Sequence, residues 1–219
     1  MPLDRAELEL VTYWTEKHGA ELSNAQLERL WNYAEMILEW NQNVNLVSRK
    51  DAHTVMLKHI LHSLTMGFFH AFKTDESVLD IGTGGGLPGI PLAIAYPETR
   101  FLLIDSVGKK INATRDMAMR LGLKNVRTLK ARAEDLKKEK FHTVVSRQVT
   151  TLKKLCDWAR PLLMDGGTLI CLKGGDIDEE IEEALVYGAT HLCFPEHVET
   201  HSVEFLGERF LQKYVLVAS

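Results

Sequence analysis

The chain has 219 residues, 45% of them hydrophobic, which is enough apolar material for one large domain or one domain with a small appendage. Its three cysteines include no C-x-x-C pair, which argues against a disulfide framework and fits a reducing cytosol. The start "MPLDRAELEL" is unlike a signal peptide and no run is long and apolar enough to span a membrane, so the sequence predicts a cytoplasmic protein without a membrane partner.

The first part of the chain is predicted to be helical. Ser23 and Gln26 form a capping box at the start of an amphipathic helix that runs to about Trp40. The polar stretch "NQNVNLVSRKD" follows, and a second helical run is expected from Ala52 to Phe72. We therefore assign residues 1–72 to an N-terminal helical extension.

Residues 73–219 alternate between strand and helix. Strands are expected at 77–82, 101–106, 125–131, 141–147 and 166–175, with helices at 88–96, 109–122, 152–163 and 176–188 between and after them. The final stretch, residues 201–219, predicts two strands joined at Gly207. This order predicts an α/β fold, a Rossmann-like doubly wound sheet that is mostly parallel and closed by an antiparallel end strand.

Charge is distributed unevenly along the chain, whose formal net charge is −4. Residues 100–173 hold 17 Lys and Arg against 7 Asp and Glu, and the remaining residues hold 9 against 23, so local charges of +10 and −14 sum to −4. The basic segment includes Lys137 and Lys138. It is consistent with a site for a polyanion, and equally with solvated helix faces that balance the acidic remainder.

The glycine-rich stretch "VLDIGTGGGLPGIPLA", residues 78–93, indicates a ligand-binding turn between a strand and a helix. Gly82, Gly84 and Gly86 form one register, and Gly84, Gly86 and Gly89 form the dinucleotide fingerprint. A carboxylate just upstream, Asp80, suits a ligand with a positive ammonium or sulfonium better than a pyrophosphate, unless it only caps loop amides. The turn therefore favours S-adenosylmethionine over a dinucleotide.

Two further positions fit an adenosine ligand. Asp105 ends the second strand, where a carboxylate accepts both ribose hydroxyls of either ligand class. Ala133 and Glu134 follow the third strand, where backbone and carboxylate groups can contact an adenine edge. Glu134 is equally consistent with a residue that begins a helix.

The residues after the fourth strand narrow the methyl acceptor. Ser146-Arg147-Gln148 stands where amine methyltransferases carry an Asn/Asp-Pro-Pro-aromatic stretch, and no cysteine has the Pro-Cys context of pyrimidine C5 enzymes. A ring nitrogen such as guanine N7 needs only in-line positioning and no general base. Arg147 cannot bind N7 and O6 together without blocking the reaction, so we expect it to hold the cofactor carboxylate, O6 alone or a phosphate.

Several stretches together resemble the glucose-inhibited division protein B family, bacterial methyltransferases that modify a guanine N7 in small-subunit ribosomal RNA. The resemblance covers nearly the whole chain. It rests on "DIGTGGGLPGIPLA", "LLIDSVGKK", "ARAEDL", "VVSRQV", "WNQNVNLVS" and "HILHSL". It implies a class I S-adenosylmethionine-dependent methyltransferase that acts on 16S ribosomal RNA or on the small ribosomal subunit, and we expect a monomer.

The resemblance also implies roles for individual residues. Those expected to contact the cofactor are Gly82, Gly84, Gly86, Leu87, Asp105, Ala133, Glu134 and Arg147. Those expected to act with Arg147 at the pocket mouth are Asn41, Asn45, His59 and Ser63. The pairs Asn41/Asn45 and His59/Ser63 share a helix face if those stretches are helical, and are otherwise capping and packing residues. His62 departs from the family, in which we expect Asp.

The sequence leaves two alternative functions open and suggests one further site, for a metal ion. A nicotinamide-dependent reductase would keep the fold and Asp105, and a non-catalytic RNA-binding module would use only the basic segment. The spacing of Cys193, His197 and His201 is compatible with a metal site, but Pro195 and the β-type residues around them argue against one, so no metal is expected.

Overall fold

A seven-stranded sheet forms the centre of the computed structural model, which describes residues 3–48, 51, 54–136 and 139–219. Its strand order is β3-β2-β1-β4-β5-β7-β6. The strands are β1 (Ser77–Ile81), β2 (Arg100–Asp105), β3 (Val126–Lys130), β4 (Phe141–Arg147), β5 (Leu163–Gly174), β6 (Val198–Ser202) and β7 (Lys213–Ala218). The first five run parallel, whereas β7 is antiparallel to β5 and β6. The predicted mostly parallel sheet with an antiparallel end is confirmed.

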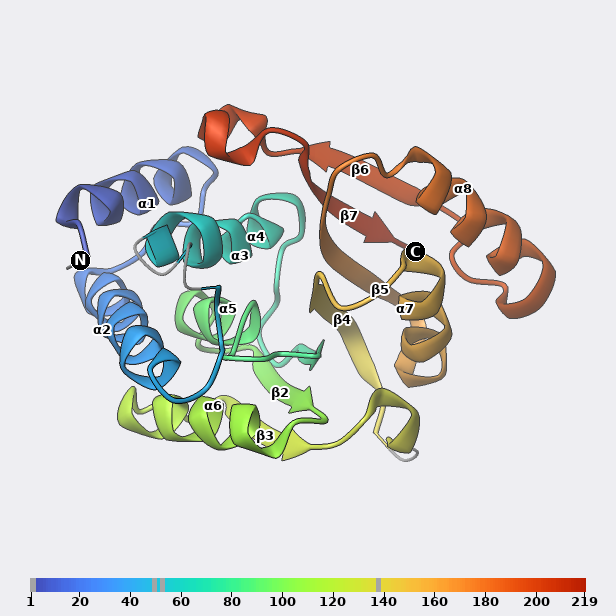
Figure 1. The fold of residues 1–219 in the computed structure, drawn as a ribbon. Coiled ribbons are helices and arrows are strands. Elements are labelled where there is room, and N and C mark those ends of the chain that lie inside the picture. The colour runs from blue at the N-terminus through green and yellow to red at the C-terminus, as the bar shows by residue number, and fades with distance from the viewer. Residues whose placement is uncertain (1–2, 49–50, 52–53, 137–138) are drawn as a thin grey trace.

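Helices cover both faces of the sheet (Figure 1). They are α1 (Arg5–Lys17), α2 (Asn24–Asn41), α3 (His62–Leu64), α4 (Met66–Phe69), α5 (Gly89–Ala95), α6 (Gly108–Arg120), α7 (Leu152–Ala159) and α8 (Asp178–Tyr187). The first six lie on one face, and α7 and α8 lie on the other. Val78 and Leu79 of β1 belong to opposite hydrophobic clusters, because successive strand residues point to opposite faces.

The N-terminal helices share their core with the sheet. Val11, Leu30 and Ile37 are fully buried in the same cluster as Phe101 of β2 and Val145 of β4. Burial of this apolar surface is the main force that holds the helices there. The division of the chain at residue 72 stays a prediction, but the two parts have one continuous core.

Polar contacts also join α2 to the sheet's first crossover. The capping box at Ser23 is confirmed, and Gln26 Nε2 also donates to the carbonyls of Ile94 and Ala95 at the end of α5. The buried Tyr33 hydroxyl donates to the Gly85 carbonyl at 2.9 Å. The N-terminal part therefore supports the glycine-rich turn directly.

Two sequence predictions differ from the structure. The expected helix 52–72, whose first two residues lie outside the described part, is a π-helical turn (Met56–Leu61) followed by the short α3 and α4. The expected pair of strands around Gly207 is present as β6 and β7, but they are joined by a longer connection in which two 3₁₀ turns flank this residue. Val203 and Phe210 are both buried, which holds the connection against the core and prevents an extended path.

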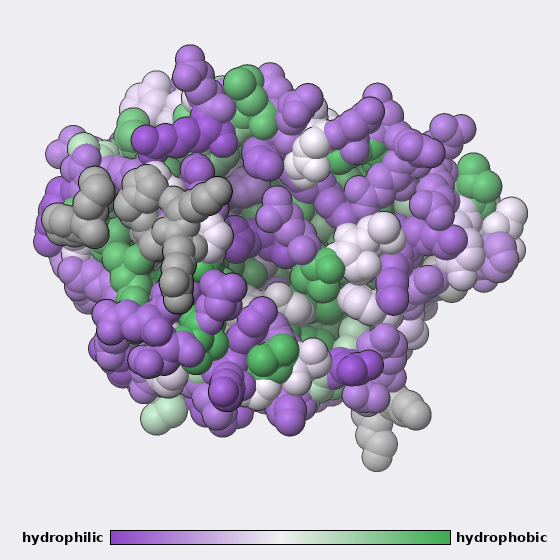
Figure 2. Space-filling view, viewed as in Figure 1, coloured by the Kyte–Doolittle hydropathy of each residue, from purple (hydrophilic) through white to green (hydrophobic). Residues whose placement is uncertain are grey.

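The surface agrees with a water-exposed fold. Figure 2 shows a mostly hydrophilic face, with hydrophobic side chains visible around a hollow near its centre. Among the described residues, no helix combines the length and apolar content that a membrane span requires.

Tyr33→Phe tests the contact between α2 and the glycine-rich turn. The variant leaves a buried carbonyl at Gly85 without its donor, so we expect the free energy of unfolding to fall by about 1–2 kcal/mol. Urea unfolding measures this change. Tyr13→Phe, at an exposed position on α1, is the control and should change stability by less than about 0.5 kcal/mol. Equal effects of the two substitutions would show that the Tyr33 hydroxyl does not support the turn.

Candidate cofactor and target site

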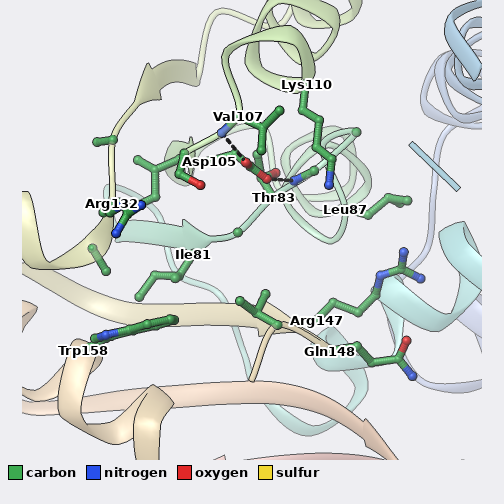
Figure 3. A pocket seen from close by; sticks show the side chains of 18 of the residues that line it. Ile81, Thr83, Leu87, Asp105, Val107, Lys110, Arg132, Arg147, Gln148 and Trp158 are labelled. Atoms are coloured by element: carbon green, nitrogen blue, oxygen red, sulfur yellow. Dashed lines mark hydrogen bonds between the residues drawn. The ribbon is translucent and has the colours of Figure 1, made fainter. Parts of the chain in front are cut away.

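A cavity of about 580 Å³ opens at the carboxyl ends of β1, β2 and β4. Open α/β sheets bind their ligands at this edge. Figure 3 shows Arg132 and Trp158 toward one end of the cavity, and Arg147 and Gln148 toward the other.

The turn after β1 needs glycine at two positions for packing reasons. Gly82 has φ of 72°, and a Cβ there would lie 2.5 Å from Val149 Cγ2. Gly86 has φ of 97°, and its Cβ would lie 2.5 Å from Ile90 Cδ1. Both φ values are in the left-handed region that favours glycine. Gly82 and Gly84 line the cavity as predicted, whereas Gly86 does not and serves the packing of α5.

Asp80 lies beneath the turn and not in the cavity lining. Its side chain is fully buried, and Oδ2 accepts from the Thr83 hydroxyl at 2.6 Å and from the Gly89 amide at 2.9 Å. Burial raises the pKa of this carboxyl to about 7. The interpretation that Asp80 faces a positive ligand is therefore not supported, and the alternative of a loop cap is the role observed.

Asp105 is oriented by backbone amides on both of its oxygens. Oδ2 accepts from Gly84 N at 3.0 Å and Oδ1 from Val107 N at 2.8 Å (Figure 3). Each carboxylate oxygen keeps a second lone pair, so this side chain still fits a ribose diol. Ala133 and Glu134 line the cavity from a 3₁₀ turn (Ala133–Asp135) that follows β3.

Arg147 lines the cavity and contacts a histidine from the N-terminal part. Its Nη1 lies 2.6 Å from His59 Nδ1. A guanidinium only donates, so Nδ1 accepts and the ring is neutral with its proton on Nε2. Burial and the nearby Arg147 charge lower the pKa of His59 to about 3. The guanidinium has no hydrogen bond to a carboxylate within the described part of the chain.

The other residues expected at the pocket mouth do not line the cavity. Asn41 Oδ1 accepts from the amides of Leu46 and Val47, which is a capping role. Asn45 is exposed and lies outside α2, so the two residues do not share a helix face, and the alternative of a capping role holds for Asn41.

Ser63 and His62 lie in the buried helical segment that begins after residue 55. Ser63 Oγ donates to the His59 carbonyl at 2.6 Å. His62 is buried with its ring edge against Phe210, and its Nε2 has no hydrogen-bond partner among the described residues. Both therefore have packing roles in this structure.

Several residues of the cavity lining were not predicted. They are Leu46, Val107, Lys110, Arg132, Gln148, Val149, Lys154 and Trp158. Most of them follow the carboxyl end of a strand, which was the available signal. Leu46 instead comes from the loop after α2, and Trp158 from the last turn of α7, so only the tertiary structure brings them to the cavity.

The residues weighed as metal ligands lie apart from this cavity. Cys193 and His197 border another cavity together with Ser219, and His201 of β6 stacks on Phe69. The described residues contain no group of three side chains arranged to hold a metal ion.

Solved structures with the same fold define the class. The chain is similar to ribosomal protein L11 methylase from Lactobacillus delbrueckii subsp. bulgaricus, with 18% identity and a TM-score of 0.56 over 74% of this chain and 78% of that one. It is also similar to M. jannaschii TYW2 in complex with AdoMet, with 19% identity and a TM-score of 0.57 over 73% of each chain. The predicted class I methyltransferase fold is confirmed.

Sequence relatives identify the family within this class. A family model described as rRNA small subunit methyltransferase G, GidB, matches residues 26–210. A protein named ribosomal RNA small subunit methyltransferase G from Chlorobium luteolum is 50% identical over 201 residues, which are 92% of this chain and 84% of that one. Its namesake from Chlorobaculum tepidum is 47% identical over 212 residues, 97% and 98% of the two chains. The chain belongs to this family.

Family membership settles three predictions made from the sequence. The resemblance is confirmed, as are the enzyme class, a methyltransferase, and the cofactor, S-adenosylmethionine. The reductase and the non-catalytic module are disfavoured. The cavity fits this cofactor, since a Cβ on Gly84 would meet nothing within 4 Å and Asp105 is free to accept from a ribose.

Gly82→Ala tests the close approach between the turn and the loop after β4. The added methyl group meets Val149, so either the turn or the loop moves and deforms the cofactor cavity. We expect S-adenosylhomocysteine affinity to fall by at least about tenfold in calorimetry. Adding Val149→Ala should restore part of it. Gly122→Ala, with a similar φ and open space at Cβ but outside the cavity lining, is the control and should leave the affinity unchanged. An equal loss in both glycine variants would contradict the steric explanation.

His62→Leu tests a pH dependence of stability. Burial lowers the pKa of His62 to about 3, below the ordinary 6.5. Between these values only the unfolded state binds the proton, so stability falls as the pH decreases through this window. The leucine variant should lose about 1 kcal/mol less than the wild type between about pH 7.5 and 5.5, as measured by urea unfolding. His197→Gln, at an exposed position, should leave the slope unchanged. An unaltered slope in His62→Leu would show that His62 is not held neutral.

Proposed function

We propose that the protein transfers a methyl group from S-adenosylmethionine to N7 of a specific guanine in 16S ribosomal RNA. The observation that carries the proposal is a cavity with an oriented Asp105 and a half-buried Arg147 that has no carboxylate partner among the described residues, in a chain of the small-subunit methyltransferase G family. When bound, the cofactor supplies an electrophilic methyl group on a sulfonium. The acceptor N7 has a free lone pair, so the protein has no proton to remove.

The residues of the site divide into two roles. Asp105, Ala133 and Glu134 line the part of the cavity proposed to hold the adenosine, whereas Leu87 lies toward the side of Arg147 (Figure 3). Arg147 and Gln148 lie toward the other end, where the methyl group and the target would meet (Figure 3). Because no general base is needed, the rate depends on holding the two reactants in line about 3 Å apart.

Arg147 is proposed to bind the cofactor's carboxylate. A half-buried guanidinium without a carboxylate partner among the described residues is compensated best by an anionic group, and less well by a neutral O6. His59 is a positioning residue in this proposal, since its Nδ1 fixes one edge of the guanidinium. Asn45 and Ser63 remain predictions: Asn45 is adjacent to the cavity residue Leu46, and Ser63 holds the His59 backbone.

Arg147→Gln separates the possible roles of this side chain. If Arg147 binds the carboxylate, the variant should bind S-adenosylhomocysteine at least about tenfold more weakly. It should bind 5′-methylthioadenosine, which lacks the amino acid part, with unchanged affinity. Calorimetry measures both ligands. Equal affinity of wild type and variant for S-adenosylhomocysteine, with a raised KM for RNA, would move Arg147 to the guanine or a phosphate.

The reaction itself is tested with methyl-labelled S-adenosylmethionine and small-subunit RNA from cells that lack the gene. The RNA is offered both naked and as assembled subunits, and N7-methylguanine is mapped by selective chain cleavage. One labelled guanine is the expected result, and the preferred form shows when in ribosome assembly the enzyme acts. No label despite cofactor binding would overturn the RNA assignment. A monomer in the cytoplasm is part of the proposal, and light scattering checks its mass.

A further inference from the structure

The cofactor cavity has an excess of positive charge. Its lining contains Lys110, Arg132, Arg147 and Lys154, and against them only Asp105 and Glu134. Arg147 is occupied by His59 and assigned to the cofactor's carboxylate above. Lys110, Arg132 and Lys154 are here named the rim cations.

The rim cations have no acidic partner in the described part of the chain. Other cations of the protein do: Lys58 pairs with Asp51, Arg120 with Glu39 and Lys173 with Glu180. Within the described part of the chain, the side-chain contact made by this group is that of Lys154 Nζ, which lies 5.3 Å from the centroid of the Trp158 ring. Lys110 is half-buried, whereas Arg132 and Lys154 are exposed. Three cations around one cavity therefore have their charge available for a ligand.

This charge does not match the cofactor. S-adenosylmethionine carries a sulfonium, an ammonium and a carboxylate, so its net charge is positive, whereas its product S-adenosylhomocysteine has lost the sulfonium and is neutral overall. The rim cations therefore repel the substrate form of the cofactor relative to the product form. Each unit charge about 8 Å away contributes roughly a twofold difference in water, and more near a protein surface.

The phosphates of an RNA backbone would neutralise the rim cations and so remove their repulsion of S-adenosylmethionine. Phosphates bind lysine and arginine side chains, and single-stranded segments follow such cations without sequence preference. We infer that Lys110, Arg132 and Lys154 bind phosphates of the RNA substrate, and that this binding raises the affinity of the cavity for S-adenosylmethionine relative to S-adenosylhomocysteine. The inference rests on the proposed RNA substrate.

The coupling has a direct consequence for turnover. Linkage is reciprocal, so S-adenosylmethionine in turn tightens RNA binding more than S-adenosylhomocysteine does. RNA is held most firmly before transfer and is released more easily afterward. Without RNA the cavity prefers the spent cofactor, which makes the free enzyme sensitive to product inhibition.

The test compares dissociation constants for the two cofactor forms by calorimetry, with and without unmethylated 16S RNA made by transcription. In the wild type, saturating RNA should lower the ratio Kd(S-adenosylmethionine)/Kd(S-adenosylhomocysteine) by roughly three- to tenfold. Raising the salt concentration without RNA should lower it too, because salt screens the rim cations. A ratio that RNA changes by less than about twofold would overturn the inference.

A variant in which all three rim cations are replaced by neutral residues tests the inference directly. In the combined variant Lys110→Gln, Arg132→Gln and Lys154→Gln, the ratio should already be low without RNA and should change little when RNA is added. The slope of log Kd for RNA against log salt should also fall by about 2. A variant that keeps the wild-type coupling would contradict the inference.

A matched control removes the same charges elsewhere. Arg29, Lys73 and Lys124 have no ion pair among the described residues and do not line the cavity, and the latter two precede strands at the opposite edge of the sheet. Their combined substitution by Gln should leave the coupling at the wild-type value. Equal loss in control and rim variants would show a general charge effect and overturn the inference. The methylation assay is independent of these ratios, so failure of the RNA assignment is recognised separately.

Discussion

The close packing of the turn after β1 is the constraint on which the rest of the structure depends. Gly82 approaches Val149 from the loop after β4, the Gly85 carbonyl accepts from Tyr33 of α2, and the Gly89 amide donates to Asp80 beneath. Each contact comes from a different element, so the turn keeps its shape only when the N-terminal helices, the sheet and the β4–α7 loop are all in place. Folding of the layers and formation of the cavity are one event.

The contact between His59 and Arg147 requires the histidine to be neutral. A protonated His59 would have two donors and no acceptor, and it would turn away from a guanidinium that also only donates. Its depressed pKa keeps the acceptor available over the whole physiological range. The proposed reaction, which has no proton transfer, has no use for a titrating group at this position, but it needs a cation held at one place. A buried neutral histidine meets that need.

Sequence patterns predicted the structural features that depend only on residues close together in the chain. The apolar runs around Leu79 and Leu103 identified strands, and Ser23 identified a helix start, because strand periodicity and capping are local. The place of Asp105 at the cavity was also predicted, since it follows from the end of a strand. The sequence could not decide between a ligand contact and a loop cap for Asp80, nor reveal that Gly86 packs against Ile90, because these partners come from the tertiary fold.

The fold places part of the basic segment of the chain at the cavity. Residues 100–173 carry a local charge of +10, although the net charge of the whole chain is −4. This segment supplies Lys110, Arg132 and Lys154 to the cavity. Its residues Lys137 and Lys138 lie outside the described residues. At physiological ionic strength charges act over about 8 Å, so a phosphate near the cavity responds to these cations and hardly to the acidic remainder. Under the proposed function, the acidic remainder disfavours RNA elsewhere on the surface. The charge distribution would therefore concentrate RNA binding at the edge of the sheet where the cavity opens.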